Sequence, residues 1–181
     1  MDILQMEQTQ NQTRPFPDSY WVIPGRLLAG EYPGSQLLPE ASRELRSLLG
    51  AGIDTFIDLT LDDQLNPYEP ILRMEANRMQ KTYSYFKFGI RDVSVPTKGQ
   101  MKRILDTIDY AMAEGYNLYV HCWGGIGRTG TVVGCYLARH GVSNQTVLGE
   151  IARLRKVVPD RRPSPETSQQ RWMVVNWQAG Q

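Results

Sequence analysis

The sequence has few of the residues on which disulfide-rich and zinc-stabilised proteins depend. Its 181 residues include two cysteines, Cys122 and Cys135, and two histidines. So few cysteines exclude a small scaffold held together by several disulfides. A structural zinc site would need all four of these side chains to converge. We therefore expect neither a disulfide framework nor a bound metal, and the question becomes whether either thiol is reactive.

A long apolar run and an excess of one charge are also absent. No segment approaches the roughly 20 apolar residues that a membrane-spanning helix requires. Lys and Arg number 20 and Asp and Glu 19, which gives a formal net charge of +1. A broad basic surface for nucleic acid is therefore not expected. Residues 1–13 are rich in Gln and lack the charged start and apolar stretch of a signal peptide. These features predict a cytoplasmic protein that neither inserts into a membrane nor binds nucleic acid.

The order of the expected elements predicts an α/β sandwich with a mostly parallel sheet. We expect residues 1–13 to form a polar, disordered tail and residues 14–181 to form one domain. Within that domain, short apolar segments typical of strands alternate with amphipathic helices. The expected strands are 20–23, 26–29, 55–59, 82–88 and 118–121. The expected helices are 40–49, 70–80, 100–114, 129–139, a helix carrying 147–154, and a last helix that starts at Ser164-Pro165-Glu166 and ends near Trp177.

The most informative stretch runs from Val120 to Gly130 and joins an expected strand to an expected helix. Three glycines lie between Cys122 and Arg128, and glycine lets backbone N–H groups turn inward without obstruction. A ring of such N–H groups at a helix N-terminus binds a tetrahedral oxyanion. Arg128 can hold two oxygens of a phosphate, and the same field stabilises a thiolate at Cys122. The expected phosphate-binding residues are Trp123, Gly124, Gly125, Ile126, Gly127 and Arg128.

The residues from His121 to Gly130 read His-Cys-x5-Arg-Thr-Gly. This resembles the signature of the cysteine-dependent protein tyrosine phosphatases, and the chain length is similar to that of their small dual-specificity branch. The resemblance extends from about Tyr20 to Trp177. It implies a three-layer α/β/α sandwich and a phosphatase that works through a cysteinyl-phosphate without metal or cofactor. It also implies that His121 shapes the loop, with a plain structural histidine as the alternative, and that Thr129 steadies the leaving thiolate, with helix capping as the alternative.

Cleavage of a phosphate ester needs a general acid beside the leaving oxygen. Asp92 lies in a loop about thirty residues before Cys122, and its position resembles that of the family's acid loop. Asp58, at the end of an expected strand, could also face the site. In the tyrosine-specific branch a glutamine positions the hydrolytic water, a role that Gln170, or Gln169, could take here. In the small branch this glutamine is often structural, so both roles of Gln170 stay open.

The function that these residues favour is hydrolysis of phosphotyrosine, and also of phosphoserine or phosphothreonine, in a protein or peptide. Cys122, Arg128 and Asp92 are the expected catalytic residues, and Cys135 is expected to be an inert core thiol. One alternative is a phosphatase of non-protein phosphoesters such as phosphoinositides or nucleotides. Another is a phosphopeptide-binding module without activity. A sulfurtransferase or arsenate reductase could use a similar loop, but His-Cys at its start and Arg-Thr-Gly at its end fit phosphatases better.

Overall fold

The computed structural model of this chain describes residues 13–35 and 37–181. The polar tail expected at residues 1–13 therefore lies, except for Thr13, outside the described residues. The strands are β1 (Ser19–Ile23), β2 (Leu27–Gly30), β3 (Thr55–Asp58), β4 (Ser84–Lys87) and β5 (Leu118–His121). The helices are α2 (Leu38–Gly50), α3 (Glu69–Arg78), α4 (Lys98–Ala113), α5 (Gly127–Arg139), α6 (Val147–Leu154), a 3-10 turn at Arg155–Val157, and α7 (Ser168–Val175).

The five strands form one sheet in the order β1-β2-β5-β3-β4. β1 and β2 are antiparallel, whereas β2, β5, β3 and β4 are parallel to one another. The mostly parallel sheet expected from the sequence is thus confirmed. Since the carboxyl ends of parallel strands meet at one edge, the loops that follow β2, β3 and β5 lie close together there.

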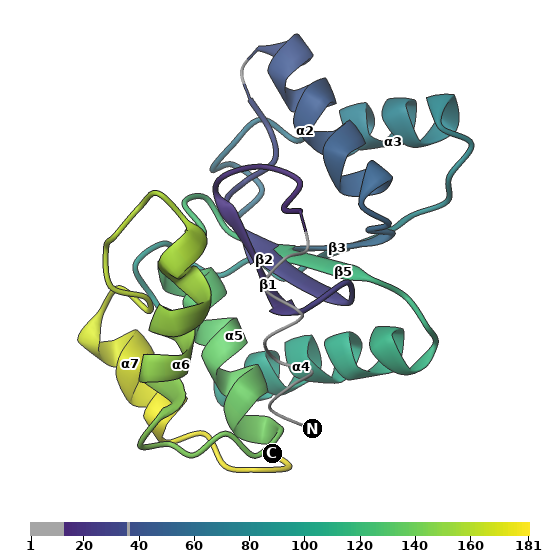
Figure 1. Cartoon of the computed structure of the whole chain (residues 1–181). Coiled ribbons are helices and arrows are strands. Elements are labelled where there is room, and N and C mark those ends of the chain that lie inside the picture. Colours follow the sequence, from purple (N-terminus) through teal and green to yellow (C-terminus); the bar gives the residue numbers. More distant parts are fainter. Residues whose placement is uncertain (1–12, 36) are drawn as a thin grey trace.

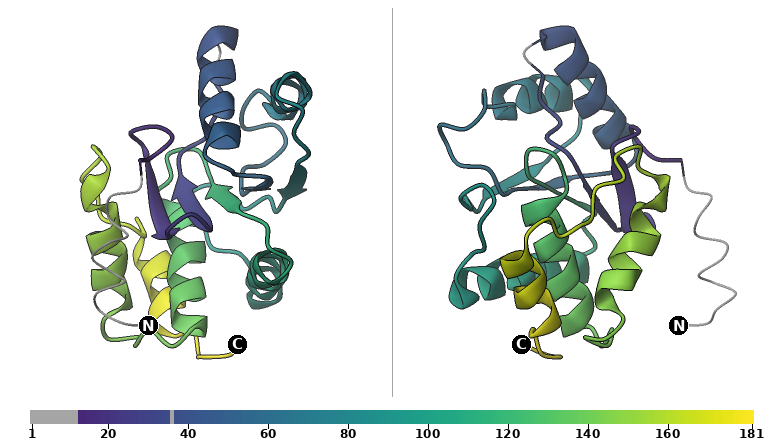
Figure 2. Two further views of the ribbon diagram at one scale, coloured as in Figure 1. Left: turned by 45° about the vertical axis from the view of Figure 1, so that its right-hand side comes forward. Right: turned by 90° about the vertical axis from the view of Figure 1, so that its left-hand side faces the viewer.

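Helices cover both faces of the sheet, as Figures 1 and 2 show: α2 and α3 lie on one face, and α4, α5, α6 and α7 on the other. Because side chains alternate along each strand, successive residues pack against the helices on opposite faces of the sheet. In β5, Tyr119 packs into the cluster under α2 and α3, while Val120 packs into the larger cluster on the opposite face. Phe56 and Ile57 divide in the same way along β3. The three-layer α/β/α sandwich is confirmed.

The start of the last helix differs from the expectation. Helix α7 begins at Ser168, not at Ser164, and Thr167 is its N-cap. The Thr167 hydroxyl accepts a hydrogen bond from the Gln170 N–H, and the Gln170 side chain accepts from the Thr167 N–H, which forms a capping box. The hydroxyl of Ser164 instead donates to the carbonyl of Ile126. The expected cap was wrong because Ser164 is engaged by a distant loop.

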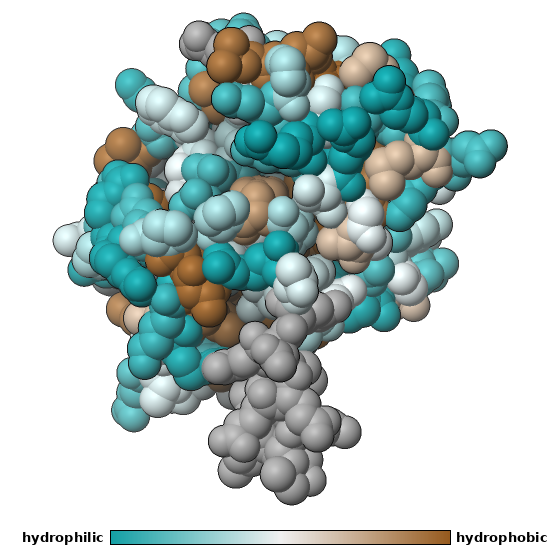
Figure 3. All heavy atoms as spheres, turned by 45° about the horizontal axis from the view of Figure 1, so that its top comes forward, coloured by the Kyte–Doolittle hydropathy of each residue, from teal (hydrophilic) through white to brown (hydrophobic). Residues whose placement is uncertain are grey.

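The described helices include none with the length and apolar character that crossing a bilayer takes. The face drawn in Figure 3 is mostly hydrophilic, and the hydrophobic residues seen on it gather in small, separate patches. Patches of this size are normal on folded domains.

Candidate active site

The loop that carries Cys122 connects the end of β5 to the start of α5, at the carboxyl edge of the parallel strands. β5 is the middle strand of the sheet, so the loops that follow β2 and β3 flank it on either side. Cys122 is buried, with 3 % of its surface exposed. The expected strand, glycine loop and helix are therefore present in that order, and they place the thiol where several loops converge.

Gly125 adopts a backbone conformation that glycine takes easily and other residues rarely do. Its φ is +65°, and a Cβ atom there would lie 2.5 Å from the carbonyl carbon of Gly30, at the end of β2. Any larger residue would strain the loop and displace β2. The N–H groups from Trp123 to Thr129 donate to no backbone carbonyl among the residues that the structure describes. They are thus free to donate to an anion. We call this loop, residues 123–128, the cradle.

The side chain of Arg128 is buried and contacts two neighbouring loops, the one that follows β3 and the one between β4 and α4. Its Nη1 donates to Gln64 Oε1 at 2.7 Å and to the carbonyl of Ile90 at 3.0 Å. Its Nη2 lies 2.9 Å from Oδ1 of Asp92. Nε is buried and has no partner within the described part of the chain. The guanidinium is therefore held in one orientation with a donor left over, which suits the binding of an oxyanion.

Asp92 lies in the segment 88–97 between β4 and α4, which we call the acid loop. About half of its side chain is exposed, and its carboxylate contacts Arg128. The structure thus brings together two of the three residues expected to be catalytic, Asp92 and Arg128, although they are 36 positions apart. An exposed carboxyl on a loop beside a buried arginine can reach the leaving group of a substrate bound at that arginine.

Asp58, the alternative candidate for the acid, is engaged elsewhere. Its Oδ1 accepts from the N–H and the hydroxyl of Thr60, and its Oδ2 accepts from the Tyr85 hydroxyl at 2.7 Å. Burial raises the pKa of Asp58, but the electrostatic effect of His121 and the hydrogen bonds from Tyr85 and Thr60 together outweigh burial and hold the pKa below its ordinary value. A buried, ionised and fully hydrogen-bonded carboxylate stabilises the end of β3 and is not placed to release a proton.

His121 lies behind the loop in a network of buried aromatic rings. Its Nε2 is 2.8 Å from the hydroxyl of Tyr68, and its Nδ1 is 3.3 Å from the carbonyl of Cys122. Burial lowers the pKa of His121, so the ring is neutral near pH 7. Since a carbonyl only accepts, the proton must lie on Nδ1, and Nε2 must accept from Tyr68. The geometry agrees with the loop-shaping role, and it adds Tyr68, which the sequence did not single out.

A Tyr68→Phe variant should lose stability and some activity. Without the hydroxyl, Nε2 of His121 is buried without a partner, which costs about 1–3 kcal/mol in the free energy of unfolding. The tautomer that donates to the Cys122 carbonyl is then no longer enforced, and we expect a several-fold lower kcat/KM. Urea unfolding and hydrolysis of an aryl phosphate would measure the two effects. Tyr83→Phe is the matched control, because the Tyr83 hydroxyl bonds to Glu69, away from the loop. Equal losses in both variants would contradict this role for Tyr68.

Thr129 and Cys135 both lie on α5, and their environments differ. The hydroxyl of Thr129 is fully buried and has no hydrogen-bond partner among the described residues. Thr129 does not cap α5, because the N-cap is Ile126 and no side chain caps this helix. Cys135 is buried in the core on the α5 side of the sheet, where burial raises the pKa of its thiol. Both cysteines are free thiols.

Gln170 is fully buried, and its side-chain amide is engaged with protein groups. Oε1 accepts from the N–H groups of Glu166 and Thr167, and Nε2 donates to the carbonyl of Ser94 at 3.0 Å. A Cβ atom at Gly127 would lie 2.9 Å from Nε2, so Gln170 also packs directly against the signature loop. Gln169 is exposed, whereas Gln170 is buried.

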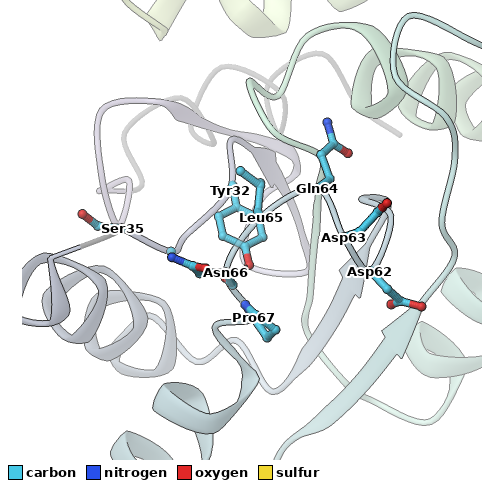
Figure 4. Close-up of a pocket in the computed structure, with 9 residues that line it drawn as sticks. Tyr32, Ser35, Asp62, Asp63, Gln64, Leu65, Asn66 and Pro67 are labelled. Atoms are coloured by element: carbon cyan, nitrogen blue, oxygen red, sulfur yellow. Dashed lines mark hydrogen bonds between the residues drawn. The ribbon is translucent and has the colours of Figure 1, made fainter.

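A cavity of about 420 Å³ lies beside Gln64 (Figure 4). Gln64, which accepts from Arg128, lines it together with Tyr32, Leu65, Asp62 and Asp63. In Figure 4 Tyr32 and Leu65 occupy the middle of the view and the two aspartates lie to one side of them. The described residues that line the cavity include no Lys or Arg. Gln64 therefore forms a shared wall between the cradle and a polar, acidic cavity.

No group of three or more His, Cys, Asp or Glu side chains arranged to hold a metal ion occurs in the part of the chain that the structure describes.

The sheet, the glycine loop and the sequence His-Cys-x5-Arg-Thr-Gly together define a member of the protein tyrosine phosphatase superfamily. The model of one family, described as "Swiss Army Knife protein, DSP-PTPase phosphatase domain", matches residues 17–173. The chain belongs to this family, and the resemblance read from the signature is confirmed.

Two curated relatives are similar to most of the chain. The mouse protein named "Protein tyrosine phosphatase domain-containing protein 1" is 31% identical over 126 residues, which cover 66% of this chain and 16% of that protein. The human "Dual specificity protein phosphatase CDC14C" is 30% identical over 129 residues, which cover 68% of this chain and 26% of that protein. The chain thus spans only a minor part of the length of these relatives.

Solved structures share the fold. "Tk-PTP in the active form" has a TM-score of 0.70 at 24% identity and covers 88% of this chain and 95% of its own. Kinase associated phosphatase, with its catalytic site cysteine replaced by serine, has a TM-score of 0.69 at 16% identity and covers 91% and 94%. PTPMT1 in complex with PI(5)P has a TM-score of 0.65 at 18% identity and covers 88% and 94%. These structures support the α/β fold of the superfamily.

Proposed function

We propose that this dual-specificity phosphatase-like chain, with residues 14–181 as one domain, hydrolyses phosphotyrosine in proteins, and phosphoserine or phosphothreonine as well, through a cysteinyl-phosphate. The observation that carries the proposal is that Arg128, which shares a loop with Cys122 and its free N–H groups, contacts Asp92 at one edge of the sheet. Asp92 lies 2.9 Å from Arg128 and is half exposed, as a proton donor to a bound substrate must be.

In the first step the thiolate of Cys122 attacks phosphorus. The S–P bond forms while the bond from phosphorus to the leaving oxygen breaks, and the Asp92 carboxyl gives its proton to that oxygen. The N–H groups from Trp123 to Arg128 and the Arg128 guanidinium hold the equatorial oxygens, where charge is spread in the transition state. The buried site strengthens each of these interactions relative to water.

In the second step the Asp92 carboxylate takes a proton from a water molecule, whose oxygen forms a bond to phosphorus. The S–P bond breaks, inorganic phosphate is released, and Cys122 returns to the thiolate. The buried hydroxyl of Thr129, which has no other partner in the described chain, is the donor we assign to the leaving thiolate. His121 fixes the Cys122 carbonyl throughout and transfers no proton.

The contact between Arg128 and Asp92 changes when a phosphate binds. Without substrate, Nη2 of Arg128 lies 2.9 Å from Oδ1 of Asp92. A bound phosphate dianion would take over the guanidinium donors and release Asp92 from this contact. Substrate binding would thus prepare Asp92 for the first step.

The acidic cavity beside Gln64 favours a protein substrate over a polyanionic headgroup. Asp62 and Asp63 line it, and although Lys87 lies 3.4 Å from Asp62, the formal charge of this group stays negative. Additional phosphates of a phosphoinositide would be repelled here, whereas a peptide's amides and hydroxyls can bond to its polar wall. The similarity to the PTPMT1 structure makes the phosphoinositide the comparison to test.

The first test measures hydrolysis of p-nitrophenyl phosphate in excess EDTA. The second compares phosphate release from two natural substrate classes, a phosphopeptide and a phosphoinositide. We expect full activity with the chelator, because the proposed steps use no metal. Phosphate release from a phosphotyrosine peptide should then exceed release from vesicles containing phosphatidylinositol 5-phosphate. Loss of activity on chelation would overturn the mechanism. Higher activity on the vesicles would overturn the substrate class, and binding of the peptide without turnover would support a binding module.

A further inference from the structure

Gln170 connects three segments that are far apart in the sequence. Its side chain accepts from the N–H groups that precede α7, packs against Gly127 of the signature loop, and donates to the carbonyl of Ser94 in the acid loop. The residue is fully buried, and Ser94 is two positions after Asp92. The bond between Gln170 and Ser94 is therefore a direct link from the base of the cradle to the loop that carries the acid.

The acid loop has an unfavourable backbone conformation between Asp92 and Ser94. Val93 has a φ of +58°, in the left-handed region that β-branched residues avoid. Its side chain is 59% exposed, so packing in the core does not hold it there. Such a conformation persists only when the surrounding bonds impose it. The Ser94 N–H donates to the Arg91 carbonyl across this turn. On one side of Val93, Asp92 contacts Arg128, and on the other, the Ser94 carbonyl accepts from Gln170.

We propose that Gln170 is a positioning residue for Asp92: by holding the Ser94 carbonyl, it keeps the acid loop against the cradle so that Asp92 can protonate the leaving oxygen. The inference rests on the proposed phosphatase reaction. This role differs from the positioning of hydrolytic water that resemblance to the tyrosine-specific branch implies, because the amide's observed bonds are to protein groups. When the link is lost, the loop leaves the strained conformation and the acid withdraws from the site.

The Gln170→Glu variant separates this role from general support of the fold. A carboxylate can still accept from the N–H groups of Glu166 and Thr167, but it cannot donate to Ser94. The measurement is kcat on two substrates: phenyl phosphate, whose leaving group needs a proton, and 2,4-dinitrophenyl phosphate, whose leaving group does not. We expect kcat to fall about tenfold or more on the first substrate and less than about twofold on the second. The inhibition constant of inorganic phosphate, which reports on the cradle, should stay unchanged in the neutral Gln170→Met variant, which adds no charge beside the loop.

Two variants serve as matched controls. Gln169→Glu adds the same charge one position away, on an exposed side chain. Thr167→Ala removes the hydroxyl that caps α7 and leaves the amide of Gln170 bonded to Ser94. Both should keep the wild-type ratio of rates on the two substrates. Gln170→Met, which fills similar space without hydrogen bonds, is the second test variant and should show the same selective loss.

The outcomes distinguish this inference from the proposed function. If the wild-type protein hydrolyses neither aryl phosphate, the proposed function itself is wrong. If the wild type is active but a folded Gln170 variant loses both rates equally, or Thr167→Ala shows the same selective loss, Gln170 only supports the structure.

If neither Gln170 variant folds, the Val93→Asn variant provides the test of the proposal. Asparagine tolerates the left-handed region better, so the rate on phenyl phosphate should equal or exceed that of the wild type, and a selective tenfold fall would overturn the proposal.

Discussion

Replacement of Cys122 by serine is expected to reduce kcat on p-nitrophenyl phosphate by about 10⁴- to 10⁶-fold, the range seen when an enzyme loses its nucleophile. A serine hydroxyl stays protonated near pH 7. Among the described site residues, Asp92 must be the acid in this step, and His121 bonds to Tyr68 and to the Cys122 carbonyl, so neither takes the proton of the serine. The loop N–H groups and Arg128 are unchanged, so the variant should still bind phosphate.

The second thiol of the chain provides the control for this prediction. Cys135 is buried in the core, and Cys135→Ala removes one sulfur atom without touching the cradle. We expect this variant to retain its activity and to lose about 1–2 kcal/mol of unfolding free energy through the small cavity. Iodoacetate should label wild type at Cys122 first, and inorganic phosphate should protect that residue. Substantial turnover by Cys122→Ser, or equal labelling of both thiols in the folded protein, would contradict the assignment.

Replacement of Asp92 by asparagine is expected to lower kcat on phenyl phosphate by about 10²- to 10⁴-fold, the usual contribution of a general acid. The amide keeps the size of the side chain and gives up the transferable proton. Loss of the negative charge also frees Arg128 from its ion pair. Inorganic phosphate should therefore bind as tightly as in the wild type, or more tightly, which a damaged fold would not allow.

The pH profile gives an independent measure of the same residue. A reaction that needs an ionised nucleophile and a protonated acid gives a bell-shaped dependence of kcat/KM on pH, with an acid and an alkaline limb. In Asp92→Asn the alkaline fall should disappear while the acid limb remains. Asp63→Asn is the matched control, since Asp63 lines the neighbouring cavity and is not among the described hydrogen-bond and ion-pair partners of Arg128. An unchanged alkaline limb in Asp92→Asn would assign the proton donor to another group.

The agreement between sequence and structure is best where an element is decided by its own residues. Leu45, Leu48 and Leu49 share one face of α2, and Met101, Ile104 and Leu105 share one face of α4, because helical spacing alone brings them together. The turn at Pro24-Gly25 likewise predicts the hairpin of β1 and β2. The start of α7 was wrong because Ser164 and Thr167 are both good caps locally, and only the contact of Ser164 with Ile126 decides between them.

The candidate site likewise has a part that its own local sequence predicts and a part that depends on distant contacts. The sequence by itself determined the cradle, since Cys122, the glycines and Arg128 lie within seven consecutive residues whose strand, loop and helix follow from local conformation. Only the tertiary structure decided which residues bond to it and to the acid loop. Gln64 accepts from Arg128, Tyr68 bonds to His121, and Gln170 donates to Ser94 in the acid loop. These polar residues look like ordinary loop or helix positions when read along the chain. Their roles arise from hydrogen bonds between residues more than fifty positions apart, which local spacing does not encode and only the packed sheet and helices create.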